Sequence, residues 1–323
     1  MIYNKKINLC FISGHYFGFK ALCGLLDSEV YRDGKLRVSS LITLDSKKER
    51  STVGYFDFAE IANTYNIQHN MVKSINSFGV IDIIENAKPD FVLVIGWSEL
   101  VPATILNLPM TIHNSNHRHL NSHGCIGMHP TLLPQGRGRA PIPWTIIKRL
   151  KETGVSAFLL EESADSGGIV LQERIFISED ETATSLFTKC ADMHYDLAQK
   201  LAPMLSSKVL TWSEQDSLKS STWEKRTPED GLINFNNCAD DIRNLVNALT
   251  RPYPGAFFYY KGTKIIVDEV ALHTQTSQCL IGTIVEMSSA GLPFICAKDG
   301  IVECKAIHVV NGDTPIFFID TWV

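Results

Sequence analysis

The sequence contains no apolar run long enough to cross a bilayer, and its first residues lack the hydrophobic stretch and cleavage site of a signal peptide. Eight cysteines are present, but no two of them form a Cys-x-x-Cys pair. Cysteines scattered in this way are typical of reduced thiols in a cytosolic protein rather than of a disulfide framework. These absences predict a cytoplasmic protein without a membrane anchor.

Positive charge is also scarce. The 30 lysines and arginines are outnumbered by 35 aspartates and glutamates, which gives a formal net charge of −5. This balance argues against a protein whose main role is to bind nucleic acid, because contacts with phosphate need lysine and arginine. The remaining composition is that of a globular protein, with 45% hydrophobic residues, and 323 residues suggest two domains.

The first half of the chain alternates between strand-like and helix-like patterns. The continuous apolar run at 91–95 suits a strand buried on both faces of a parallel sheet. The alternation predicts an α/β domain over residues 1–205, with a Rossmann-like, doubly wound sheet. Strands are expected at 7–12, 38–43, 91–95, 154–160 and 169–177, and helices at 17–26, 56–65, 80–87, 141–151 and 183–205.

The pattern changes after residue 205. A polar, serine-rich stretch at 206–225 indicates a linker between the two domains. Turn signals at Lys261-Gly262 and Asp299-Gly300 separate short strand-like runs, which predicts a small OB-like β-barrel domain over 226–323. Its expected elements are a helix at 240–249 and strands at 256–260, 264–268, 280–287, 294–297 and 301–309.

One histidine lies at the end of a short apolar run. His129 follows residues 125–128 and precedes a proline turn and a loop rich in glycine and arginine. This pattern places an imidazole at the carboxyl end of a buried strand, where open α/β sheets form their ligand crevice. Asp165 follows on a loop of small residues between two strand-like runs. Taken singly, each residue also fits an ordinary core or turn position. On neighbouring strand ends, the two would form a proton-transfer pair.

Two further segments invite a ligand interpretation. The turn at 13–18 lacks the full Gly-x-Gly-x-x-Gly pattern, so it favours a turn over a substrate crevice rather than a nicotinamide site. The segment 111–124 carries four histidines, and the spacing of His113 and His117 would suit a metal on a helix. Its many Asn, Ser and Gly residues instead predict a polar insertion without a metal.

Four motifs in order resemble the folate-dependent formyltransferases. Residues 127–141, Gly-Met-His-Pro-Thr-Leu-Leu-Pro-Gln-Gly-Arg-Gly-Arg-Ala-Pro, resemble the family signature, and 164–167 resemble its acidic loop. Residues 225–233 and 250–257 resemble the C-terminal domain shared by methionyl-tRNA formyltransferase and the sugar N-formyltransferases. The resemblance covers nearly the whole chain.

The resemblance implies transfer of a formyl group from N10-formyltetrahydrofolate to a primary amine, often in a homodimer. His129 would be the catalytic histidine, and Asp165 would fix its orientation and raise its basicity. Residues implied in binding the folate are Ile95, Gly96, Trp97, Ser98, Leu132, Leu133 and Asp165. Residues expected to contact the acceptor are Gly14, His15, Phe17, Asn121, Arg137, Lys225, Arg226 and Tyr253. For Arg137 and Arg139, a solvated loop position is an equal alternative.

One position departs from the family pattern. Family members normally carry an asparagine two residues before the histidine, and here that position is Gly127. Loss of such an oxyanion donor lowers rates about a hundred- to thousandfold in other enzymes. Protonated His129, a backbone N–H or an asparagine of the preceding insertion, such as Asn121, would be replacements. We expect the insertion and the glycine to be linked.

Charge also bears on the acceptor. Residues 206–323 contain 10 Lys and Arg against 14 Asp and Glu, a net of −4, and segment 111–124 has a single arginine. A tRNA acceptor needs basic surface, so the balance favours a nucleotide-linked amino sugar. The family's habits suggest a 4-amino-4,6-dideoxy sugar on UDP or dTDP, formylated for a surface glycan such as lipopolysaccharide. Methionyl-tRNA, hydrolysis of formyl-folate, and ligand binding without turnover remain alternatives.

Overall fold

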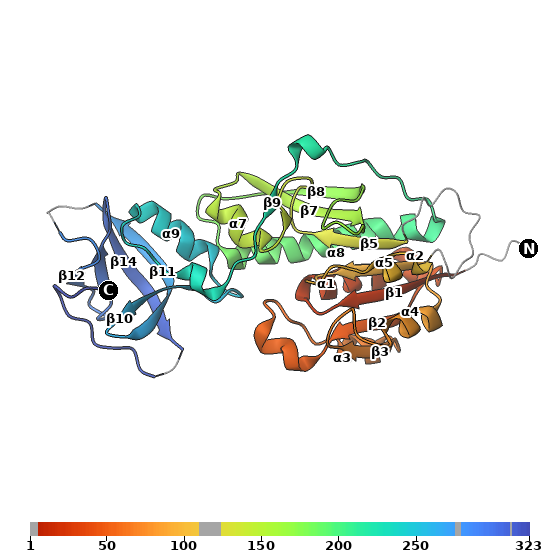
Figure 1. The fold of residues 1–323 in the computed structure, drawn as a ribbon, viewed down its shortest axis with the longest axis horizontal. Coiled ribbons are helices and arrows are strands. Elements are labelled where there is room, and N and C mark those ends of the chain that lie inside the picture. Colours follow the sequence, from red (N-terminus) through yellow and green to blue (C-terminus); the bar gives the residue numbers. More distant parts are fainter. Residues whose placement is uncertain (1–5, 110–123, 275–278, 311) are drawn as a thin grey trace, which may run out of the picture. The chain divides into compact units, whose positions relative to one another are not determined.

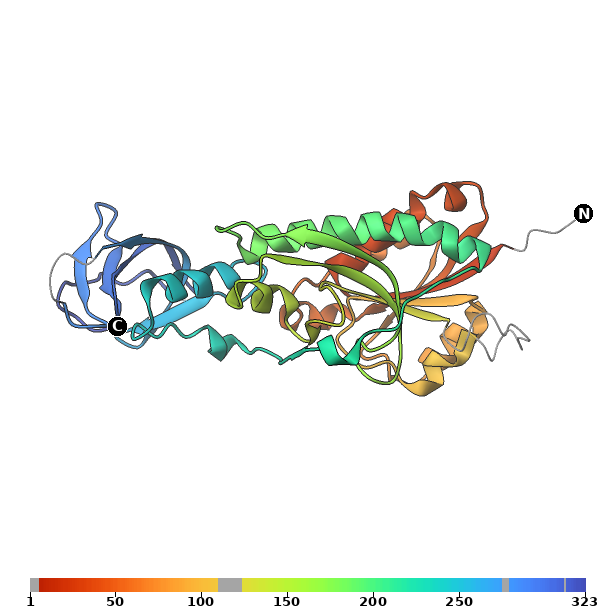
Figure 2. The same cartoon turned by 90° about the horizontal axis from the view of Figure 1, so that it is seen from above.

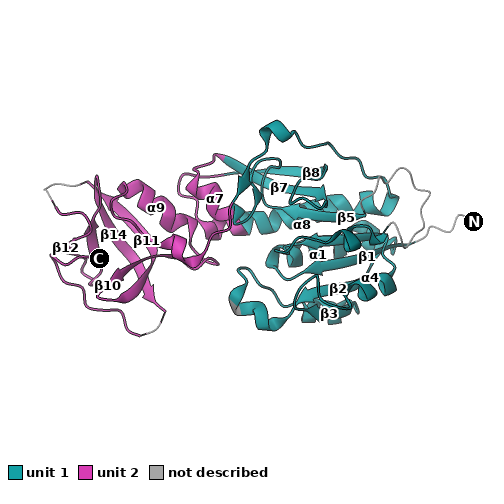
Figure 3. Ribbon diagram, viewed as in Figure 1, with its two compact units in different colours: residues 1–141, 152–176, 188–223 teal, residues 142–151, 177–187, 224–323 magenta. Residues whose placement is uncertain are grey.

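The computed structural model describes residues 6–109, 124–274, 279–310 and 312–323. The chain divides into two compact units, which are coloured separately in Figure 3. Unit 1 contains residues 1–141, 152–176 and 188–223, and unit 2 contains residues 142–151, 177–187 and 224–323.

Unit 1 is built on a seven-stranded sheet with the order β3-β2-β1-β4-β5-β7-β8 (Figure 1). The first five strands in this order are parallel, whereas β7 runs antiparallel to both of its neighbours. The predicted Rossmann-like α/β fold is therefore confirmed. The strands are β1 (Ile7–Ser13), β2 (Leu36–Leu44), β3 (Gln68–Val72), β4 (Phe91–Ile95), β5 (Cys125–His129), β7 (Glu152–Leu159) and β8 (Ile169–Phe176).

Helices cover both faces of this sheet, which is why its central strands are apolar throughout. Helices α1 (Tyr16–Leu26) and α8 (Ala183–Ser207) lie on one face, and α4 (Val80–Ala87) and α5 (Ala103–Leu106) lie on the other (Figure 2). All five residues of β4 are buried. The shorter helical elements of unit 1 are α2 (Glu29–Arg32), η1 (Ser46–Ser51), α3 (Ala59–Thr64) and η2 (Ser217–Lys219).

The stretch expected to be a linker is bonded to unit 1 as far as Trp223. Ser213 pairs with Ile169 at the start of β8. The short strand β9 (Thr222–Trp223) pairs in parallel with β6 (Arg137–Gly138), which lies in the loop after His129. The chain therefore returns to the loop after His129 before its last segment, which begins at residue 224, joins unit 2.

Unit 2 contains a five-stranded antiparallel sheet with the order β10-β11-β14-β13-β12, as expected for a small barrel-like domain. Helix α9 (Ala239–Ala248) packs on it through an apolar face that includes Ile242 and Val246. The strands are β10 (Ala256–Tyr260), β11 (Thr263–His273), β12 (Ile284–Met287), β13 (Pro293–Cys296) and β14 (Ile301–Val309). Helix α7 (Pro141–Ile147) and the turn η3 (Pro228–Gly231) complete the elements.

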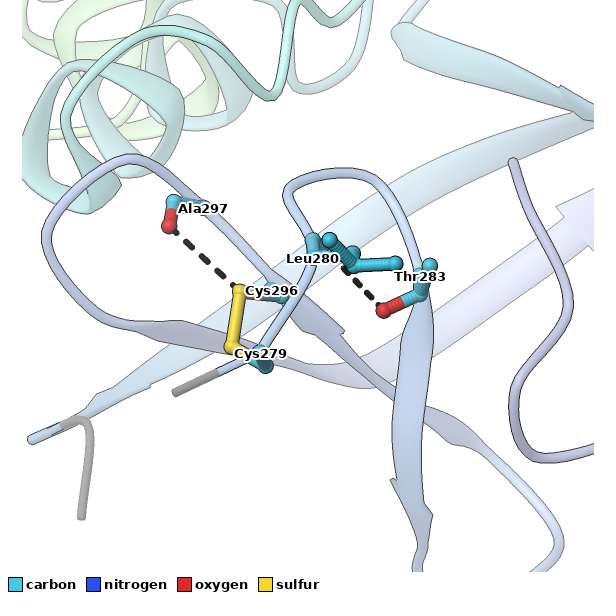
Figure 4. Close-up of a disulfide and its surroundings, with 5 residues drawn as sticks. All are labelled: Cys279, Leu280, Thr283, Cys296 and Ala297. Carbon is cyan, nitrogen blue, oxygen red and sulfur yellow. Dashed lines mark hydrogen bonds between the residues drawn. A yellow bond between two sulfur atoms is a disulfide. The ribbon is translucent and has the colours of Figure 1, made fainter. Parts of the chain in front are cut away.

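A disulfide joins Cys279 to Cys296 in unit 2 (Figure 4). The expectation that all eight cysteines are reduced is therefore wrong for this pair. The turn from Leu280 to Thr283, closed by a backbone hydrogen bond, folds Cys279 back onto the end of β13. The pairing depends on that turn and on the β12–β13 register, neither of which cysteine spacing reveals. Within the described residues, no helix is both long and apolar enough to span a membrane.

Candidate active site

The carboxyl ends of β1, β4 and β5 lie side by side at one edge of the sheet. Strand order reverses between β1 and β4, and β5 follows β4 in parallel, with Met128 opposite Ile95. In open α/β sheets, this switch point is where ligands bind. His129 is the last residue of β5, so it lies at this edge, as the sequence predicts.

A backbone carbonyl orients the imidazole of His129. The Nε2 atom lies 2.8 Å from the oxygen of Gly136, in the loop that follows β5. A carbonyl oxygen only accepts hydrogen bonds, so Nε2 carries the proton in the neutral ring and Nδ1 holds a free lone pair. His129 is 8% exposed, so little room remains for other orientations. The free lone pair makes Nδ1 the atom that can accept a proton.

Asp165 lies beside Nδ1 without orienting the ring. Its Oδ2 atom is 3.8 Å from Nδ1 of His129 and accepts a hydrogen bond of 2.8 Å from the N–H of Gly138. The expectation that the carboxylate fixes the ring is therefore corrected, because the carbonyl of Gly136 does so. Nδ1 and Oδ2 can instead both accept hydrogen bonds from one donor group that bridges them from one side.

The route that brings Asp165 to His129 differs from the expected one. Because β7 is antiparallel to β5, its last residues pair with the beginning of β5, and the N–H of Leu160 donates to the carbonyl of Cys125. The following loop folds back until Asp165 reaches Gly138. The sequence predicts the two residues on neighbouring strand ends, but the carboxyl ends of β5 and β7 lie at opposite edges of the sheet. A folded loop brings them together.

The loop carrying Gly136 is held by the segment that returns from α8. The N–H of Gly136 donates to Oγ of Ser221 at 2.9 Å, and the N–H of Arg139 donates to the carbonyl of Trp223 at 3.0 Å. A Cβ on Gly136 would lie 2.7 Å from the indole of Trp223, so the ring packs directly on the glycine. Sequence reasoning treated this segment as linker and missed both Ser221 and Trp223.

The end of β4 presents main-chain groups at the same edge. Ile95 is fully buried, whereas Gly96 and Ser98 are exposed. Gly96 has a φ of +67°, and a Cβ there would lie 2.5 Å from Cβ of His15, so glycine is required. The indole N–H of Trp97 donates to Glu99 at 3.1 Å, which fixes the ring. Glu99, which sequence reasoning missed, therefore supports this part of the crevice.

Leu132 and Leu133 pack into the loop after His129. Leu133 is 3% exposed; its N–H donates to Oγ of Ser156 and its carbonyl accepts from Gln172. Leu132 is half-buried, and its Cδ2 would lie 2.5 Å from a Cβ on Gly154 of β7. Both leucines therefore pack next to β7, and the polar backbone of Leu133 is bonded within the protein.

Gly14, His15 and Phe17 lie after β1. His15 caps helix α1 by accepting the N–H of Phe17 at its Nδ1 atom. A Cβ on Gly14 would lie 2.5 Å from Cβ of Leu44, so no larger residue fits. The side chain of Phe17 is 6% exposed and stacks on His194 of α8, with ring centroids 4.6 Å apart. Phe17 thus packs between this turn and α8, whereas half-buried His15 is the better candidate for contact with a ligand.

Of the remaining predicted residues in the loops and the insertion, the structure describes the two arginines. Asn121 and the histidines of segment 111–124 lie outside the described residues. Arg137 donates to Gln215 through Nε and Nη2, and the guanidinium of Arg139 donates to the carbonyl of Ser98 at 3.3 Å. Both arginines therefore have partners at the edge of the sheet. Within the described part of the chain, no group of three or more His, Cys, Asp and Glu residues is arranged for a metal ion.

The family of the chain is settled by sequence models that cover both units. A model described as "Formyl transferase" matches residues 11–200, and "Formyl transferase, C-terminal domain" matches residues 225–314. The chain belongs to the formyl transferase family. The positions of His129 and Asp165 at the switch-point edge thus occur in a family with acyl-transfer chemistry.

Curated relatives of the chain include a polymyxin resistance protein and methionyl-tRNA formyltransferases. The chain is 35% identical over 196 residues to the bifunctional polymyxin resistance protein ArnA of Wigglesworthia glossinidia brevipalpis. This match covers 60% of the chain and 28% of that protein. It is 30% identical over 203 residues to the methionyl-tRNA formyltransferase of Alkaliphilus oremlandii, covering 63% of the chain and 61% of that protein. The matched regions are thus under two thirds of either relative.

Solved structures share the fold at low sequence identity. WlaRD, a sugar 3N-formyl transferase crystallised in the presence of dTDP and 5-N-formyl-THF, has a TM-score of 0.60 and 16% identity, covering 95% of this chain and 98% of that chain. An N-formyltransferase from Helicobacter canadensis, in complex with folinic acid and dTDP-3-aminofucose, has a TM-score of 0.58 and 15% identity, covering 92% and 98%. These likenesses establish the fold.

The position where this formyl transferase departs from the family pattern is filled by another side chain. A Cβ on Gly127 would lie 2.7 Å from Cδ2 of Leu160 and 3.3 Å from Cε1 of Phe158. Leu160 packs against the apolar cluster on the α4 and α5 face of the sheet. An apolar group therefore occupies the space into which a side chain at 127 would project.

Three predicted acceptor contacts of the formyl transferase belong to unit 2. Lys225 is exposed, and Tyr253 is half-buried in the turn after α9. Arg226 lies over the ring of Trp144 with its guanidinium carbon 5.0 Å from the centroid, and Lys148 lies 5.4 Å from the same ring. Burial lowers the pKa of Arg226. Cations and an aromatic ring are thus gathered within unit 2 itself.

His194 should make unit 1 of this formyl transferase sensitive to acid. It is fully buried, and its Nδ1–H donates to the carbonyl of Cys190. Burial lowers its pKa to about 4, against the Cys190 bond, which raises it, and with a smaller lowering by His129. The unfolded chain, with a pKa near 6.5, binds more protons below that pH, so stability present above pH 6.5 is lost as the pH falls.

We therefore expect the free energy of unfolding to fall by about 3 kcal/mol between pH 7 and pH 4 because of His194 alone. His194→Phe should remove that part of the slope, since phenylalanine keeps the stacking on Phe17. Urea unfolding of both proteins at several pH values measures the difference. Equal slopes in wild type and variant would show that His194 does not contribute.

Proposed function

We propose that the protein transfers the formyl group of N10-formyltetrahydrofolate to the primary amine of a nucleotide-linked amino sugar. The observation that carries the transfer reaction is the pairing of Nδ1 of His129 with Oδ2 of Asp165, 3.8 Å apart at the switch-point edge. Family membership supports the same chemistry. The acceptor is inferred separately, from charge.

Because Nδ1 of His129 has a free lone pair, it is the atom that accepts the proton of the amine. The acceptor amine bridges Nδ1 and Oδ2 from one side, with one N–H donated to each, so both groups hold it toward the formyl carbon. The amine nitrogen bonds to that carbon, its proton passes to Nδ1, and the bond from the carbon to N10 of the folate breaks. The imidazolium then returns its proton to N10. The products are the formamide and tetrahydrofolate, and His129 and Asp165 return to their starting states.

The end of β4 suits the pterin ring of the donor. Gly96 and Ser98 are exposed and are proposed to contact a flat, polar ring, and Trp97 is fixed beside them by Glu99. Ile95, Leu132 and Leu133 are apolar residues next to these segments and are proposed to supply apolar contacts. Ligand pockets combine these features, a mostly apolar wall with a few placed polar groups.

Charge favours a small acceptor over tRNA. Residues 206–323, which include all of the unit 2 sheet, carry a net −4. A protein that neutralises many RNA phosphates needs a basic surface there. Lys225, Arg226 and Tyr253 are proposed to contact a UDP or dTDP moiety, because cations and an aromatic ring suit a nucleoside diphosphate. The product would enter surface-glycan assembly such as lipopolysaccharide, and we propose a cytoplasmic homodimer.

Methionyl-tRNA is the second candidate acceptor. Its support is that methionyl-tRNA formyltransferases from Alkaliphilus oremlandii and Syntrophomonas wolfei are 30% and 28% identical to the chain, over 63% and 77% of its length. The net negative charge of residues 206–323 argues against it. A protein that binds these ligands without turnover is the third candidate, because of Gly127.

Incubation with N10-formyltetrahydrofolate decides among these candidates. Purified protein is mixed with the donor and, in parallel, with UDP- and dTDP-amino sugars or charged initiator tRNA. We expect one sugar nucleotide to gain a single formyl unit by mass spectrometry, with an equal yield of tetrahydrofolate. Formylation of tRNA alone would overturn the acceptor proposal. Formate without a formylated acceptor would indicate hydrolysis, and binding without any product would indicate that the chemistry has been lost.

A further inference from the structure

One side chain of the returning segment joins the two loops of the active site. The Nε2 group of Gln215 donates to the carbonyls of Asp165 and Gly167, at 2.8 Å and 2.7 Å. Its Oε1 atom accepts from Nε and Nη2 of Arg137, at 3.1 Å and 2.7 Å. Both N–H groups and both lone pairs of the amide are thus used.

Asp165 needs such support because of its backbone. Its φ is +53°, in the left-handed region that is uncommon for non-glycine residues, although aspartate adopts it more often than most. The two carbonyls that Gln215 binds belong to Asp165 itself and to the residue two positions later. Gln215 therefore holds the main chain at Asp165 and at Gly167. These bonds fix the direction in which the carboxylate of Asp165 projects.

The contact with Arg137 completes a ring of hydrogen bonds. Arg137 precedes Gly138, whose N–H donates to Oδ2 of Asp165. Gln215 thus holds the Asp165 loop through its N–H groups and the donor's strand, β6, through its oxygen. A shift of either loop would lengthen the bond between Gly138 and Asp165 and change the distance from the carboxylate to His129.

We infer that Gln215 is a positioning residue for formyl transfer, which keeps the Asp165 carboxylate beside Nδ1 of His129. It acts through the backbone of Asp165. The kinetic part of this inference depends on the proposed transfer reaction, whereas the structural part can be measured without any substrate.

Two substitutions separate the roles of the two ends of the amide. Gln215→Glu keeps an oxygen for Arg137 but cannot donate to the two carbonyls, whereas Gln215→Leu loses both functions. We expect each to lower kcat about tenfold while KM for donor and acceptor stays within about twofold, because misplacement of a reacting group slows the bound complex. Gln68→Leu, the same change at an exposed position of β3, is the matched control and should retain wild-type kinetics.

Wild-type kcat in Gln215→Glu would overturn the inference, since only the Arg137 contact would then matter. A raised KM with unchanged kcat would also overturn it, because it would mean that Gln215 contributes to substrate binding. The acceptor used is whichever one the wild-type protein formylates.

Amide hydrogen exchange tests the structural part in the ligand-free protein. The N–H of Gly138 is protected by its bond to Asp165. We expect NMR to show exchange of this amide about tenfold faster in both Gln215 variants, with exchange in β4 and the Gln68→Leu control unchanged. A wild-type exchange rate at Gly138 would overturn the inference. If the wild-type protein formylates nothing, the proposed function fails, and the exchange rates still decide the role of Gln215.

Discussion

Replacing His129 by alanine is expected to lower kcat for formyl transfer about a thousandfold. In the structure Nε2 is engaged with the carbonyl of Gly136, so Nδ1 is the atom that accepts the amine proton. Positioned acid–base groups typically contribute a hundred- to ten-thousandfold, and here one ring would serve both proton transfers. The measurement is kcat with saturating donor and acceptor, with product followed by mass spectrometry.

The control for this substitution is His308→Ala on β14 of unit 2. His308 pairs with Asp268 at 2.6 Å, so it is also a histidine next to a carboxylate, but it is not at the switch-point edge. We expect wild-type kcat for this control and similar donor affinity for all three proteins. If His129→Ala kept more than about a tenth of the wild-type rate, another group would be the base and the proposed mechanism would fail.

Gly127→Asn is expected to lower kcat about a hundredfold, although it restores the residue found in the family pattern. The space beyond Gly127 is occupied by Leu160, with Cδ2 2.7 Å from the position of a Cβ. Leu160 is half-buried and would have to shift to admit the amide, and overpacking of this kind costs about 1–3 kcal/mol. Residue 127 lies two positions before His129 on β5, so displacement of the strand also moves the imidazole. Thermal unfolding and kcat measure the two effects.

Gly127→Asn combined with Leu160→Ala provides the control, because the smaller side chain makes room for the amide. The double variant should unfold at a higher temperature than Gly127→Asn and recover part of its rate, which a double-mutant cycle expresses as a favourable coupling. Gly127→Ala should be milder than Gly127→Asn. A faster enzyme of unchanged stability in the single variant Gly127→Asn would show that the site has room for the amide and lacks only its donor.

The fold was predictable from short apolar runs and turn residues, because these patterns depend on local backbone geometry. The run at 91–95 became β4, with every residue buried, and the run ending at His129 became β5. Parallel order then placed His129 at the switch-point edge, since the direction of each strand follows from an intervening helix. The antiparallel direction of β7 was not visible, because its pattern of buried residues is the same in either direction.

Contacts made by side chains far apart in the sequence were not predictable. The sequence marks residues 206–225 as polar, yet Gln215 and Ser221 are polar because they bond to the loops of Asp165 and Gly136. Leu160 reads as the end of a strand, and only the folded loop brings it against Gly127. The Cys279–Cys296 pair similarly depends on a turn and a strand register.

The sequence by itself determined the α/β class, the antiparallel second domain, the family, and the candidacy of His129 and Asp165, because each depends on local pattern or on a contiguous motif. Only the tertiary structure decided which ring nitrogen of His129 is free, what holds Asp165 beside it, and what fills the space next to Gly127. Those depend on a carbonyl at Gly136, an amide at Gln215 and a methyl group at Leu160, which reach the site only when distant segments pack together.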